Sequence, residues 1–452
     1  MVRHCREPNI DTIMPRKEVL ARSWARTLDY LFNQRPAFER EGAKGYKPGL
    51  DVTIALDKLY DSPHRHYRII HIAGTNGKGS TAHTLAAVLQ QCGYRVGLFT
   101  SPHLVDFRER IRVNGHKVSR NYVMKWVADY RKKNIQTMEP SFFELVTIMA
   151  FDYFAWRKVD VAVIETGLGG RLDSSNIITP DLSIITNIGL EHQQFLGNTL
   201  EEIAHEKAGI IKQGRPVVVG YADGIVREVM NQVAQKHSAE ICFAEESPEV
   251  TTAKHCIDSL RLTTKNYGTL DYELTGDYQV ENANTVLTAI DILRDLDFQI
   301  SDKAVHDGFA HVVENTGLMG RWMKLNDKPL AICDSAHNPP GMQQAMKQLQ
   351  AGNHKRLHMV LGFMGDKDVA TMLKMMPKTA KYYFTQAQTS RTMTVESLQQ
   401  IAAQNGIKGI IYNNVADAYA AALSNAAPED IIYVGGSMYV LAELLTHLGY
   451  DK

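Results

Sequence analysis

The chain has 452 residues, of which 44% are hydrophobic and 22% are charged, a composition typical of a globular protein with a hydrophobic core. Lysine plus arginine and aspartate plus glutamate number 50 each, so no net charge draws the chain to nucleic acid or to an anionic membrane. No apolar run reaches the roughly 20 residues that cross a bilayer. We therefore expect neither a nucleic-acid partner nor a membrane partner.

The N-terminal segment up to Lys17 is charged and has no apolar core of the kind found in secretory signals. Either Met1 or Met14 could be the start of the protein, and the sequence leaves this open. Five cysteines are scattered along the chain without a C-x-x-C pair, at Cys5, Cys92, Cys242, Cys256 and Cys333. This usage predicts free thiols in a reducing cytoplasm.

β-branched apolar runs alternate with helical patterns along the chain, which is typical of an α/β protein with mainly parallel sheets. The first series of expected strands covers 68–73, 96–100, 159–165, 182–187 and 216–220. The second series covers 330–333, 357–362, 382–385, 409–412 and 431–434. A polar stretch at 223–275, with strand-like runs at 260–264 and 269–274, predicts an antiparallel flap on the first domain.

A glycine-containing turn, Thr316-Gly-Leu-Met-Gly320, separates the two series of strands. Such turns commonly mark domain boundaries. We predict an N-terminal, P-loop-type, parallel-sheet ATP-binding domain over residues 1–316. A smaller, Rossmann-like α/β domain is expected over residues 317–452.

The segment from Ile69 to Thr81 contains a β-branched run, a glycine-rich turn and a helix-forming run, in that order. This order suits a phosphate-binding loop, because glycines let backbone N–H groups face an anion and the helix N-terminus adds partial positive charge. Lys78 adds a full charge, and Ser80 or Thr81 could ligate Mg²⁺. A complete P-loop has glycine where this chain has Ile72, and a tight turn with a surface lysine is the alternative. We expect ATP to bind at this loop.

Polar side chains follow four of the expected strands, at the positions where ligands bind in open α/β sheets. They are Thr100 with Ser101, Glu165, His192 and Asp334. Glu165 resembles the acidic residue that positions Mg²⁺ beside a phosphate loop. Each of these residues could instead cap a turn, and an isolated histidine is more often not a ligand. Together they predict a shared cleft with metal-compatible ligands.

Lys207 continues the apolar stripe of an expected helix that begins with a capping box, Thr199-Leu-Glu-Glu202. The other members of the stripe are Leu200, Ile203, Ala204 and Ile211. The amine should point inward, where it needs a partner or must lose its charge, unless its long stem lets it reach the surface. A neutral lysine beside Mg²⁺ could react with CO₂ to form a carbamate, but the pattern supports only the inward direction.

Two adjacent aromatic residues in Ser141-Phe-Phe-Glu144 precede an expected helix from Leu145 to Trp156. They could stack on a flat heterocycle or anchor the core, and the sequence by itself favours the core. Arg321 follows the expected linker. It could neutralise charge on a transferring phosphoryl group or form an ordinary ion pair between domains.

Taken together, these segments resemble the folylpolyglutamate synthase/dihydrofolate synthase family, a branch of the Mur ligase superfamily. The resemblance extends from about Gly49 to Leu445. It is carried by the motifs Gly74-Thr-Asn-Gly-Lys-Gly-Ser-Thr81, Thr100-Ser-Pro-His103, Phe142-Phe-Glu144, Glu165-Thr-Gly-Leu-Gly-Gly-Arg-Leu-Asp173, His192, Glu206-Lys-Ala-Gly209, Gly320-Arg321 and Asp334-Ser-Ala-His-Asn-Pro339. The family has Gly-Lys-Gly-Ser where other P-loops have Gly-Lys-Ser, which accounts for the incomplete P-loop pattern.

The resemblance implies a nucleotide site shared by both domains, the first of which would be of the Mur ligase central type. Phosphate-binding residues would be Gly74, Thr75, Asn76, Gly77, Lys78, Gly79 and Ser80, with Asn282 near the adenine. Arg321 and Asp334 would complete the nucleotide site, and His337 would lie near the glutamate and the phosphoryl group. Ser335 departs from the family's usual Asp-Gly-Ala-His, which we expect to be tolerated unless that position needs a positive φ.

The resemblance also implies two Mg²⁺ ions and a pterin site. Ser101 and Glu165 would bind one ion, with Ser80 as a further ligand, and Glu165 and His192 the second, beside a carbamylated Lys207. The pterin-binding residues would be Ser141, Phe142, Phe143, Glu144, Leu172, Asp173 and Ser174. Lys78, Lys207, Arg321 and His337 would take part in catalysis.

The implied reaction is ATP-dependent amide ligation, in which a substrate carboxylate is phosphorylated and the amine of L-glutamate attacks the resulting acyl phosphate. The carboxylate would come from dihydropteroate, as in a dihydrofolate synthase, and from folates, as in a folylpolyglutamate synthase. We expect a cytoplasmic monomer that binds only small molecules.

Three alternatives stay open. The first is a folylpolyglutamate synthase that does not use dihydropteroate. The second is a Mur-type peptidoglycan ligase acting on a UDP-sugar, which the motifs at Phe142 and Thr100 disfavour. The third is a nucleotide-dependent switch without ligase activity, which the presence of Lys78, Glu165 and Lys207 disfavours.

Overall fold

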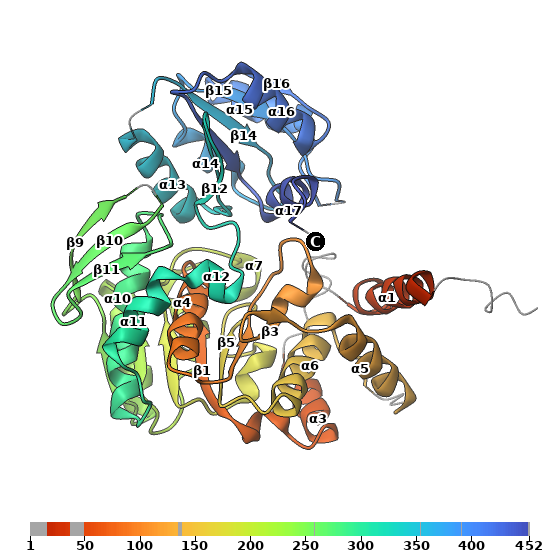
Figure 1. Cartoon of the computed structure of the whole chain (residues 1–452), viewed down its shortest axis with the longest axis vertical. Coiled ribbons are helices and arrows are strands. Elements are labelled where there is room, and N and C mark those ends of the chain that lie inside the picture. The colour runs from red at the N-terminus through yellow and green to blue at the C-terminus, as the bar shows by residue number, and fades with distance from the viewer. Residues whose placement is uncertain are drawn as a thin grey trace, which may run out of the picture.

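The computed structural model describes residues 16–36, 49–133, 138–256, 258–352, 354–389 and 391–450, which form two lobes, one above the other in Figure 1. Met1, Met14 and Cys5 lie outside these ranges. The N-terminal lobe contains an eight-stranded sheet in the order β4-β3-β2-β5-β1-β6-β7-β8. Its strands are β1 (Arg68–Ala73), β2 (Val96–Phe99), β3 (Ile111–Val113), β4 (His116–Lys117), β5 (Val161–Glu165), β6 (Leu182–Ile185), β7 (Val217–Val219) and β8 (Ile241–Phe243).

Helices cover both faces of this sheet (Figure 1). They are α1 (Arg16–Asn33), α3 (Asp51–Leu59), α4 (Lys78–Gln91), α5 (Arg120–Lys132), α6 (Phe142–Trp156), α7 (Gln193–Leu196), α8 (Leu200–Ala208), α9 (Gly224–Lys236), α10 (Gln279–Asp295), α11 (Asp302–Ala310) and α12 (Val312–Thr316). Short 3-10 helices cover η3 (Pro63–His66), η4 (Phe107–Arg110) and η5 (Ser174–Ile177). One core cluster joins the sheet to α4, α10 and α11, and another joins it to α1, α3, α5 and α6.

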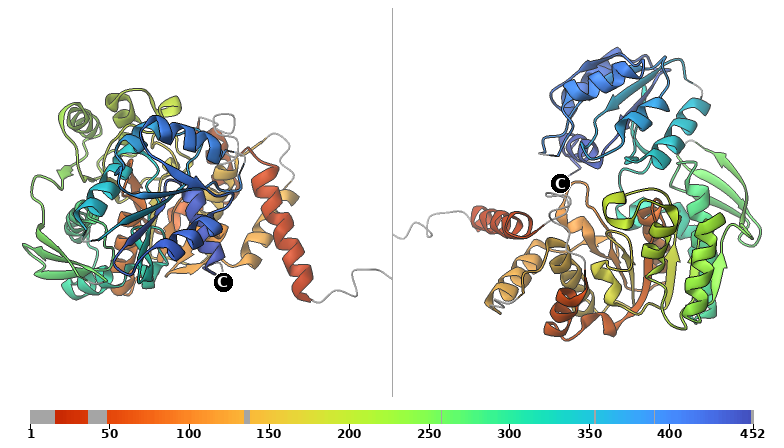
Figure 2. Two further views of the ribbon diagram at one scale, coloured as in Figure 1. Left: turned by 90° about the horizontal axis from the view of Figure 1, so that it is seen from above. Right: turned by 180° about the vertical axis from the view of Figure 1, so that it is seen from behind.

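The central strands carry apolar residues without alternation because both of their faces are covered. All five residues of β5, for example, are buried. At one edge, β3 pairs antiparallel with both β2 and β4. The remaining neighbours, in the order β2-β5-β1-β6-β7-β8, pair in parallel. Figure 2 shows from above and from behind that α1 projects from the side of this lobe.

The C-terminal lobe contains a six-stranded sheet in the order β12-β13-β17-β14-β15-β16, parallel except for β12. Its strands are β12 (Met323–Asp327), β13 (Leu330–Cys333), β14 (Leu357–Leu361), β15 (Lys381–Phe384), β16 (Gly409–Ile411) and β17 (Ile431–Gly435). Its helices are α13 (Pro339–Ala351), α14 (Val369–Lys374), α15 (Val395–Gln404), α16 (Val415–Asn425) and α17 (Met438–His447). Each of these five helices has a side-chain N-cap, which satisfies a backbone N–H of its first turn.

A three-stranded antiparallel sheet of β9 (Val250–His255), β10 (Leu260–Thr264) and β11 (Thr269–Tyr272) packs on the N-terminal lobe. Leu262 and Tyr272 of this flap are buried in the same core cluster as α4 and α10. The two α/β lobes and the parallel sheets confirm the fold class predicted from the sequence. The flap predicted over 223–275 is confirmed only for β9 to β11, because residues 224–236 form α9 and residues 241–243 form β8 of the eight-stranded sheet. The predicted division between residues 316 and 317 stays a prediction, and it falls between α12 and β12.

The expected apolar stripe around Lys207 is wrong at two positions. Leu200 is 37% exposed, and Ile211 lies beyond α8, which ends at Ala208. The helix is shorter than the pattern suggested, because the chain turns at Gly209 to pack against Arg171. The described cysteines are all free. No helix within the described ranges has both the length and the hydropathy needed to cross a membrane.

Helices α4 and α11 pack so closely that Gly308 faces the backbone of α4. A Cβ at Gly308 would lie 2.6 Å from Val88 Cα and 2.7 Å from Val88 N. Because α4 follows the glycine-rich loop, this contact also fixes the position of that loop.

We predict that Gly308→Ala lowers the free energy of unfolding by about 1–3 kcal/mol, because the added methyl group pushes α11 away from α4. Urea unfolding followed by circular dichroism measures the change. Lys303→Ala on the exposed side of α11 is the control, with an expected change within about 0.5 kcal/mol. Equal stability of the Gly308 variant and the parent protein would contradict the tight packing.

Candidate active site

The glycine-rich loop between β1 and α4 has the backbone shape of a phosphate-binding loop. Gly74 and Gly77 have φ values of 147° and 85°. A Cβ at Gly74 would lie 1.8 Å from Thr186 Oγ1, and one at Gly77 would lie 2.2 Å from Asn282 Oδ1. Both positions therefore require glycine.

The helix that follows this loop is open to an anion at its N-terminus. The N-cap of α4 is Gly77, which has no side chain to occupy the first-turn N–H groups. Lys78 Nζ folds back and donates to the Gly74 and Thr75 carbonyls at 2.8 and 3.1 Å. The loop thus combines free backbone donors, a helix dipole and a fixed cation, which together fit a polyphosphate.

Helix α10 holds the other side of this loop. Asn282 donates to Gln279 Oε1 at 2.8 Å, and Gln279 Nε2 donates to Ser80 Oγ at 3.1 Å. These contacts orient the Ser80 hydroxyl at the start of α4. Asn282, predicted to lie near the adenine, contacts the phosphate loop itself at Gly77.

Glu165 ends β5 as a buried carboxylate, and its Oε2 accepts the Ser101 N–H at 3.2 Å. Burial raises the pKa of this carboxyl, and the nearby Lys78 ammonium opposes the rise. A Cβ at Gly79 would lie 3.5 Å from Arg321 Nη2 and 3.9 Å from Glu165 Oε2. The phosphate loop, a carboxylate and an arginine of the C-terminal lobe therefore meet at one point.

The residues around Glu165 at the phosphate loop fit a magnesium ion that also binds a phosphate. Among the described residues, no group of three or more His, Cys, Asp or Glu side chains could hold a metal by itself. Mg²⁺ usually binds one or two carboxylates and completes its shell with water and phosphate oxygens, for which Glu165, Ser80 and Ser101 provide suitable oxygen atoms. The pairing of Glu165 with His192 around a second ion stays a prediction.

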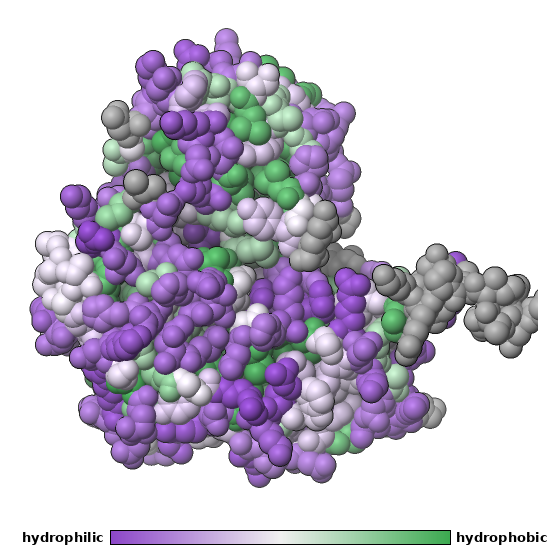
Figure 3. Space-filling model, in the orientation of Figure 1, coloured by the Kyte–Doolittle hydropathy of each residue, from purple (hydrophilic) through white to green (hydrophobic). Residues whose placement is uncertain are grey.

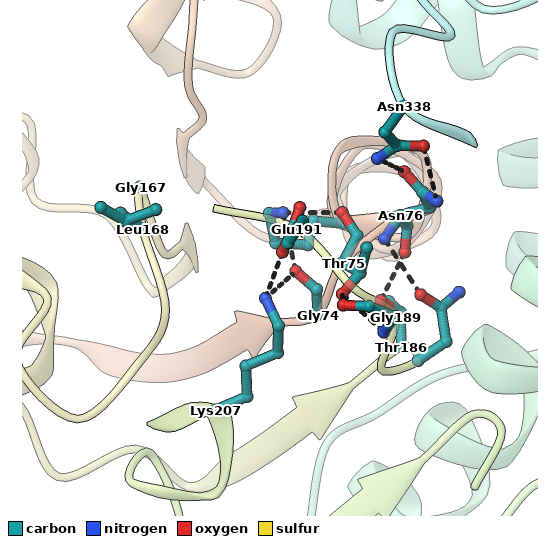
Figure 4. Close-up of polar contacts among 12 residues, drawn as sticks. Gly74, Thr75, Asn76, Gly167, Leu168, Thr186, Gly189, Glu191, Lys207 and Asn338 are labelled. Carbon is teal, nitrogen blue, oxygen red and sulfur yellow. Dashed lines mark hydrogen bonds and ion pairs between the residues drawn. The ribbon is translucent and has the colours of Figure 1, made fainter. Parts of the chain in front are cut away.

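Lys207 points inward, as predicted, and is 1% exposed. Its Nζ donates to the Gly74 carbonyl at 2.8 Å and to Glu191 Oε1 at 2.5 Å (Figure 4). Burial lowers the pKa of Lys207, and the Glu191 carboxylate opposes this. The buried amine thus has the partner that its burial requires.

Two imidazoles face the space between the lobes. His192 lies just before α7, and His337 follows β13 and donates from Nδ1 to the Ser335 carbonyl at 2.9 Å. Burial lowers the pKa of each imidazole to about 4, so both are neutral at neutral pH. Lys367 of the C-terminal lobe lies close enough to both to lower their pKa values further.

A cavity of about 490 Å³ lies between the lobes, lined by segments that follow the carboxyl ends of strands from both sheets. Figure 3 shows the hollow between the lobes, with hydrophobic and hydrophilic residues at its rim. Six of the seven predicted pterin-binding residues line it: Ser141, Phe142, Phe143, Leu172, Asp173 and Ser174. Ser101, His192 and His337 line it as well.

Glu144, the seventh of these residues, acts as a helix cap. Its Oε2 accepts the Ser141 N–H at 2.7 Å and the Ser141 hydroxyl at 2.8 Å, completing the capping box of α6. Phe142 belongs mainly to the core, with 2% exposure and a stacked contact to Phe32 at 4.6 Å between ring centroids. Asp173 accepts the N–H groups of Gly167 and Leu168 at 2.8 Å each and so holds the loop after β5 against the cavity.

Asp334 joins the two lobes. Its Oδ2 accepts the Tyr278 hydroxyl at 2.7 Å and the Trp322 N–H at 2.8 Å. Burial raises the pKa of this carboxyl, and the hydrogen bond from Tyr278 opposes the rise. Ser335 does not have a positive φ, and its hydroxyl contacts the Arg321 guanidinium, so the departure from Asp-Gly-Ala-His is accommodated.

Sequence reasoning missed several residues of this site. Glu191 precedes His192 directly, and a carboxylate next to a candidate metal ligand is the signal that could have found it. Lys367 and Arg391 follow β14 and β15 and line the cavity, although no motif marked them. Asn338 lay within a quoted motif and received no role.

Two family models match the chain. The Mur ligase middle domain matches residues 72–290, and the Mur ligase glutamate ligase domain matches residues 320–438. These ranges contain the eight-stranded and six-stranded sheets, apart from the first residues of β1.

Relatives with curated names match over most of the chain. The dihydrofolate synthase/folylpolyglutamate synthase of Bacillus subtilis is 36% identical over 73% of this chain and 79% of that protein. A probable bifunctional folylpolyglutamate synthase/dihydropteroate synthase of Haloferax volcanii is 34% identical over 88% of this chain, which spans only 48% of that longer protein.

A solved structure, E. coli FolC in complex with DHPP and ADP, superposes with a TM-score of 0.80 and 29% identity. The match covers 94% of this chain and 98% of that one. On this evidence the chain belongs to the folylpolyglutamate synthase/dihydrofolate synthase family of Mur ligase-type proteins.

Proposed function

We propose that this chain is an ATP-dependent amide ligase that joins L-glutamate to dihydropteroate and to folates through an acyl-phosphate intermediate. The observation that carries the proposal is the cavity of about 490 Å³ between the lobes, which has an aromatic wall and a cationic wall. A flat ring with an anionic tail matches these two walls. The names of the Bacillus subtilis and Escherichia coli relatives, both dihydrofolate synthase/folylpolyglutamate synthase, support the same substrates.

The aromatic wall comes from the N-terminal lobe. Phe32, Phe143, Leu168 and Leu172 line this end of the cavity, with polar groups at Ser141 and Asp173. Apolar walls with a few fixed polar groups are the usual setting for a drug-sized heterocycle. This end of the cavity suits a pterin ring.

The cationic wall comes from the C-terminal lobe. Lys367 and Arg391 line it beside the neutral His337, and Asp366 pairs with Arg391 at 2.9 Å. Cations are suited to the carboxylates of glutamate. A ligand spanning both walls would present its carboxylate to the point where Ser101, Glu165 and Arg321 meet.

Phosphoryl transfer requires that negative charge be neutralised as it moves to the acceptor carboxylate. Lys78 lies over the phosphate loop, and Arg321 lies beside Gly79 from the opposite lobe. Mg²⁺, held by Glu165 with the hydroxyls of Ser80 and Ser101, would add charge stabilisation at the same oxygens. The two lobes exclude water from the acyl phosphate, which would otherwise hydrolyse before the glutamate amine attacks.

Lys207 and His192 would bind a second metal ion. A carbamate on Lys207 would convert the buried cation into an anion that can bind a second Mg²⁺ with His192 and Glu165. Glu191, now paired with Lys207, would then have to move, since two adjacent carboxylates repel each other.

We propose that the enzyme acts as a monomer on small-molecule substrates. The free cysteines are compatible with a cytoplasmic location. Both are part of the proposal.

The first prediction concerns the substrates. The purified protein should release ADP with dihydropteroate plus L-glutamate and with tetrahydrofolate plus L-glutamate, and mass spectrometry should find products heavier by one glutamate residue. Mixtures lacking either acceptor or amino acid are the controls. ADP release with tetrahydrofolate plus L-glutamate but not with dihydropteroate plus L-glutamate would contradict the proposed dihydrofolate synthase activity. ADP release in none of the mixtures would favour a nucleotide-dependent switch.

The second prediction concerns Lys207. Lys207→Ala should lower turnover by at least about 100-fold, and added formate or acetate should restore part of it by replacing the carbamate as a metal-binding anion. Lys207→Arg, which keeps the cation but forms no stable carbamate, should stay inactive with either acid. Turnover near that of the parent protein in Lys207→Ala would contradict the carbamate.

The third prediction concerns Arg321. Arg321→Ala should lower kcat by about 100-fold or more, because an arginine that meets the transferring phosphoryl group stabilises mainly the transition state. The dissociation constant for ADP, measured by calorimetry, should change much less. An unchanged kcat would contradict this role and would indicate that Arg321 serves only as a structural partner of Ser335.

A further inference from the structure

Asn76 at the tip of the phosphate loop and Asn338 at the start of α13 form a reciprocal amide pair between the lobes (Figure 4). Asn338 Nδ2 donates to Asn76 Oδ1 at 3.1 Å, and Asn76 Nδ2 donates to Asn338 Oδ1 at 3.4 Å. Each amide thus uses both a donor and an acceptor on the other.

The orientation of both amides follows from the helix cap. Asn338 Oδ1 accepts the Gly341 N–H at 2.9 Å as the N-cap of α13, so its amide nitrogen must face the phosphate loop. Asn76 must then present its oxygen to that nitrogen. The pair therefore has one allowed arrangement.

The backbone of Asn76 is already held by the N-terminal lobe. Its N–H donates to Asn187 Oδ1 at 3.0 Å, and its carbonyl accepts the Thr186 hydroxyl at 2.6 Å. The side chain has no part in those contacts. It extends from the rigid loop toward the C-terminal lobe.

Helix α13 offers few backbone donors toward the loop. Its first two residues, Pro339 and Pro340, have no N–H, and the Gly341 N–H is used by the cap. The Met342 N–H donates to the Asn338 carbonyl at 2.9 Å. The side-chain amide of Asn338 is therefore the donor that this helix directs to the loop.

We propose that Asn76 and Asn338 are a positioning pair that transmits occupancy of the phosphate loop to α13 and so aligns the C-terminal lobe for phosphoryl transfer. This proposal rests on the function proposed above. Neither residue is a catalytic residue, because each acts through the placement of other groups. His337 and Asp334 precede Asn338 closely in the chain, so a shift of α13 moves both of them relative to the loop.

The experiment uses variants that break the bridge while each lobe keeps its other contacts. Asn338→Ser keeps an N-cap, because serine caps helices as well as asparagine does, but its hydroxyl is too short to exchange two hydrogen bonds with Asn76. Asn76→Ala removes only the side chain, since the contacts to Thr186 and Asn187 are made by the backbone. Asn414→Ser, the same change at the N-cap of α16, is the matched control.

Each bridge variant should lower kcat for ligation about fivefold with KM for ATP nearly unchanged, as expected for loss of a net hydrogen bond that matters in the transition state. The double variant should lose about fivefold as well, because both changes break the same bridge. The Asn414 control should keep the kcat of the parent protein. Losses that multiply to about 25-fold in the double variant, or a raised KM with unchanged kcat, would overturn the proposal.

Hydrogen exchange provides a readout that does not require ligation. Addition of ADP to the full chain should slow amide exchange in α13 of the parent protein, and this response should be lost in Asn76→Ala although ADP still binds. An equal α13 response in the variant would overturn the bridge. Failure of ADP to bind the parent protein at all would instead overturn the proposed function, so the two failures are distinguishable.

Discussion

The site depends on the direction of the strands in two parallel sheets. All parallel strands of a sheet end at the same edge, and the residues that follow them gather there. In this chain the carboxyl edges of both sheets contribute to one cavity, which is lined by Ser101 and His192 from one lobe and by His337 and Lys367 from the other. Each lobe therefore carries only part of the chemistry, and the distance between the lobes sets whether the parts meet.

The lysine ammonium groups of this site are held by groups with which the phosphates of a nucleotide would compete. Lys78 is bound by two loop carbonyls, and Lys207 by a carbonyl and Glu191. Buried charges are costly unless they are paired, so these contacts keep the ammonium groups in place. The phosphates of a nucleotide would offer the Lys78 ammonium stronger, negatively charged partners. The site can therefore bind anions, and its buried ammonium groups still have partners when no anion is bound.

The sequence was sufficient to locate the strands that bury both faces. β1 and β13 begin and end at the expected residues, because each is a short apolar run that ends at a glycine or a polar residue, Gly74 after β1 and Asp334 after β13. Five strands were missed, β3, β4, β8, β9 and β12, all at or near sheet edges, whereas the edge strands β11 and β16 were predicted. Most residues of β9, for example, are exposed and polar, so its strand conformation comes from pairing with β10 rather than from its own pattern.

The same distinction applies to the site. Glu165, Lys207 and the phosphate loop could be predicted because a local pattern, a strand end or a helix stripe fixes where each side chain points. Glu191 stands next to His192, which is a local signal, but its pairing with Lys207 could not be predicted, since it arises only when α8 brings the amine to it. The contact between Tyr278 and Asp334 joins residues of different lobes, and no local pattern specifies it.

The contacts between the lobes are mostly polar at this end of the molecule. Besides the Asn76–Asn338 and Tyr278–Asp334 pairs, Gln348 accepts the Asp277 N–H at 2.9 Å. Water can replace such hydrogen bonds at small net cost, whereas separating an extended apolar interface would expose surface that water solvates poorly. A ligase of the proposed kind, which must admit an acceptor and L-glutamate and release a charged product, needs lobes that can separate. Polar bridges such as the one between Asn76 and Asn338 meet this need, because they align the lobes without preventing their opening.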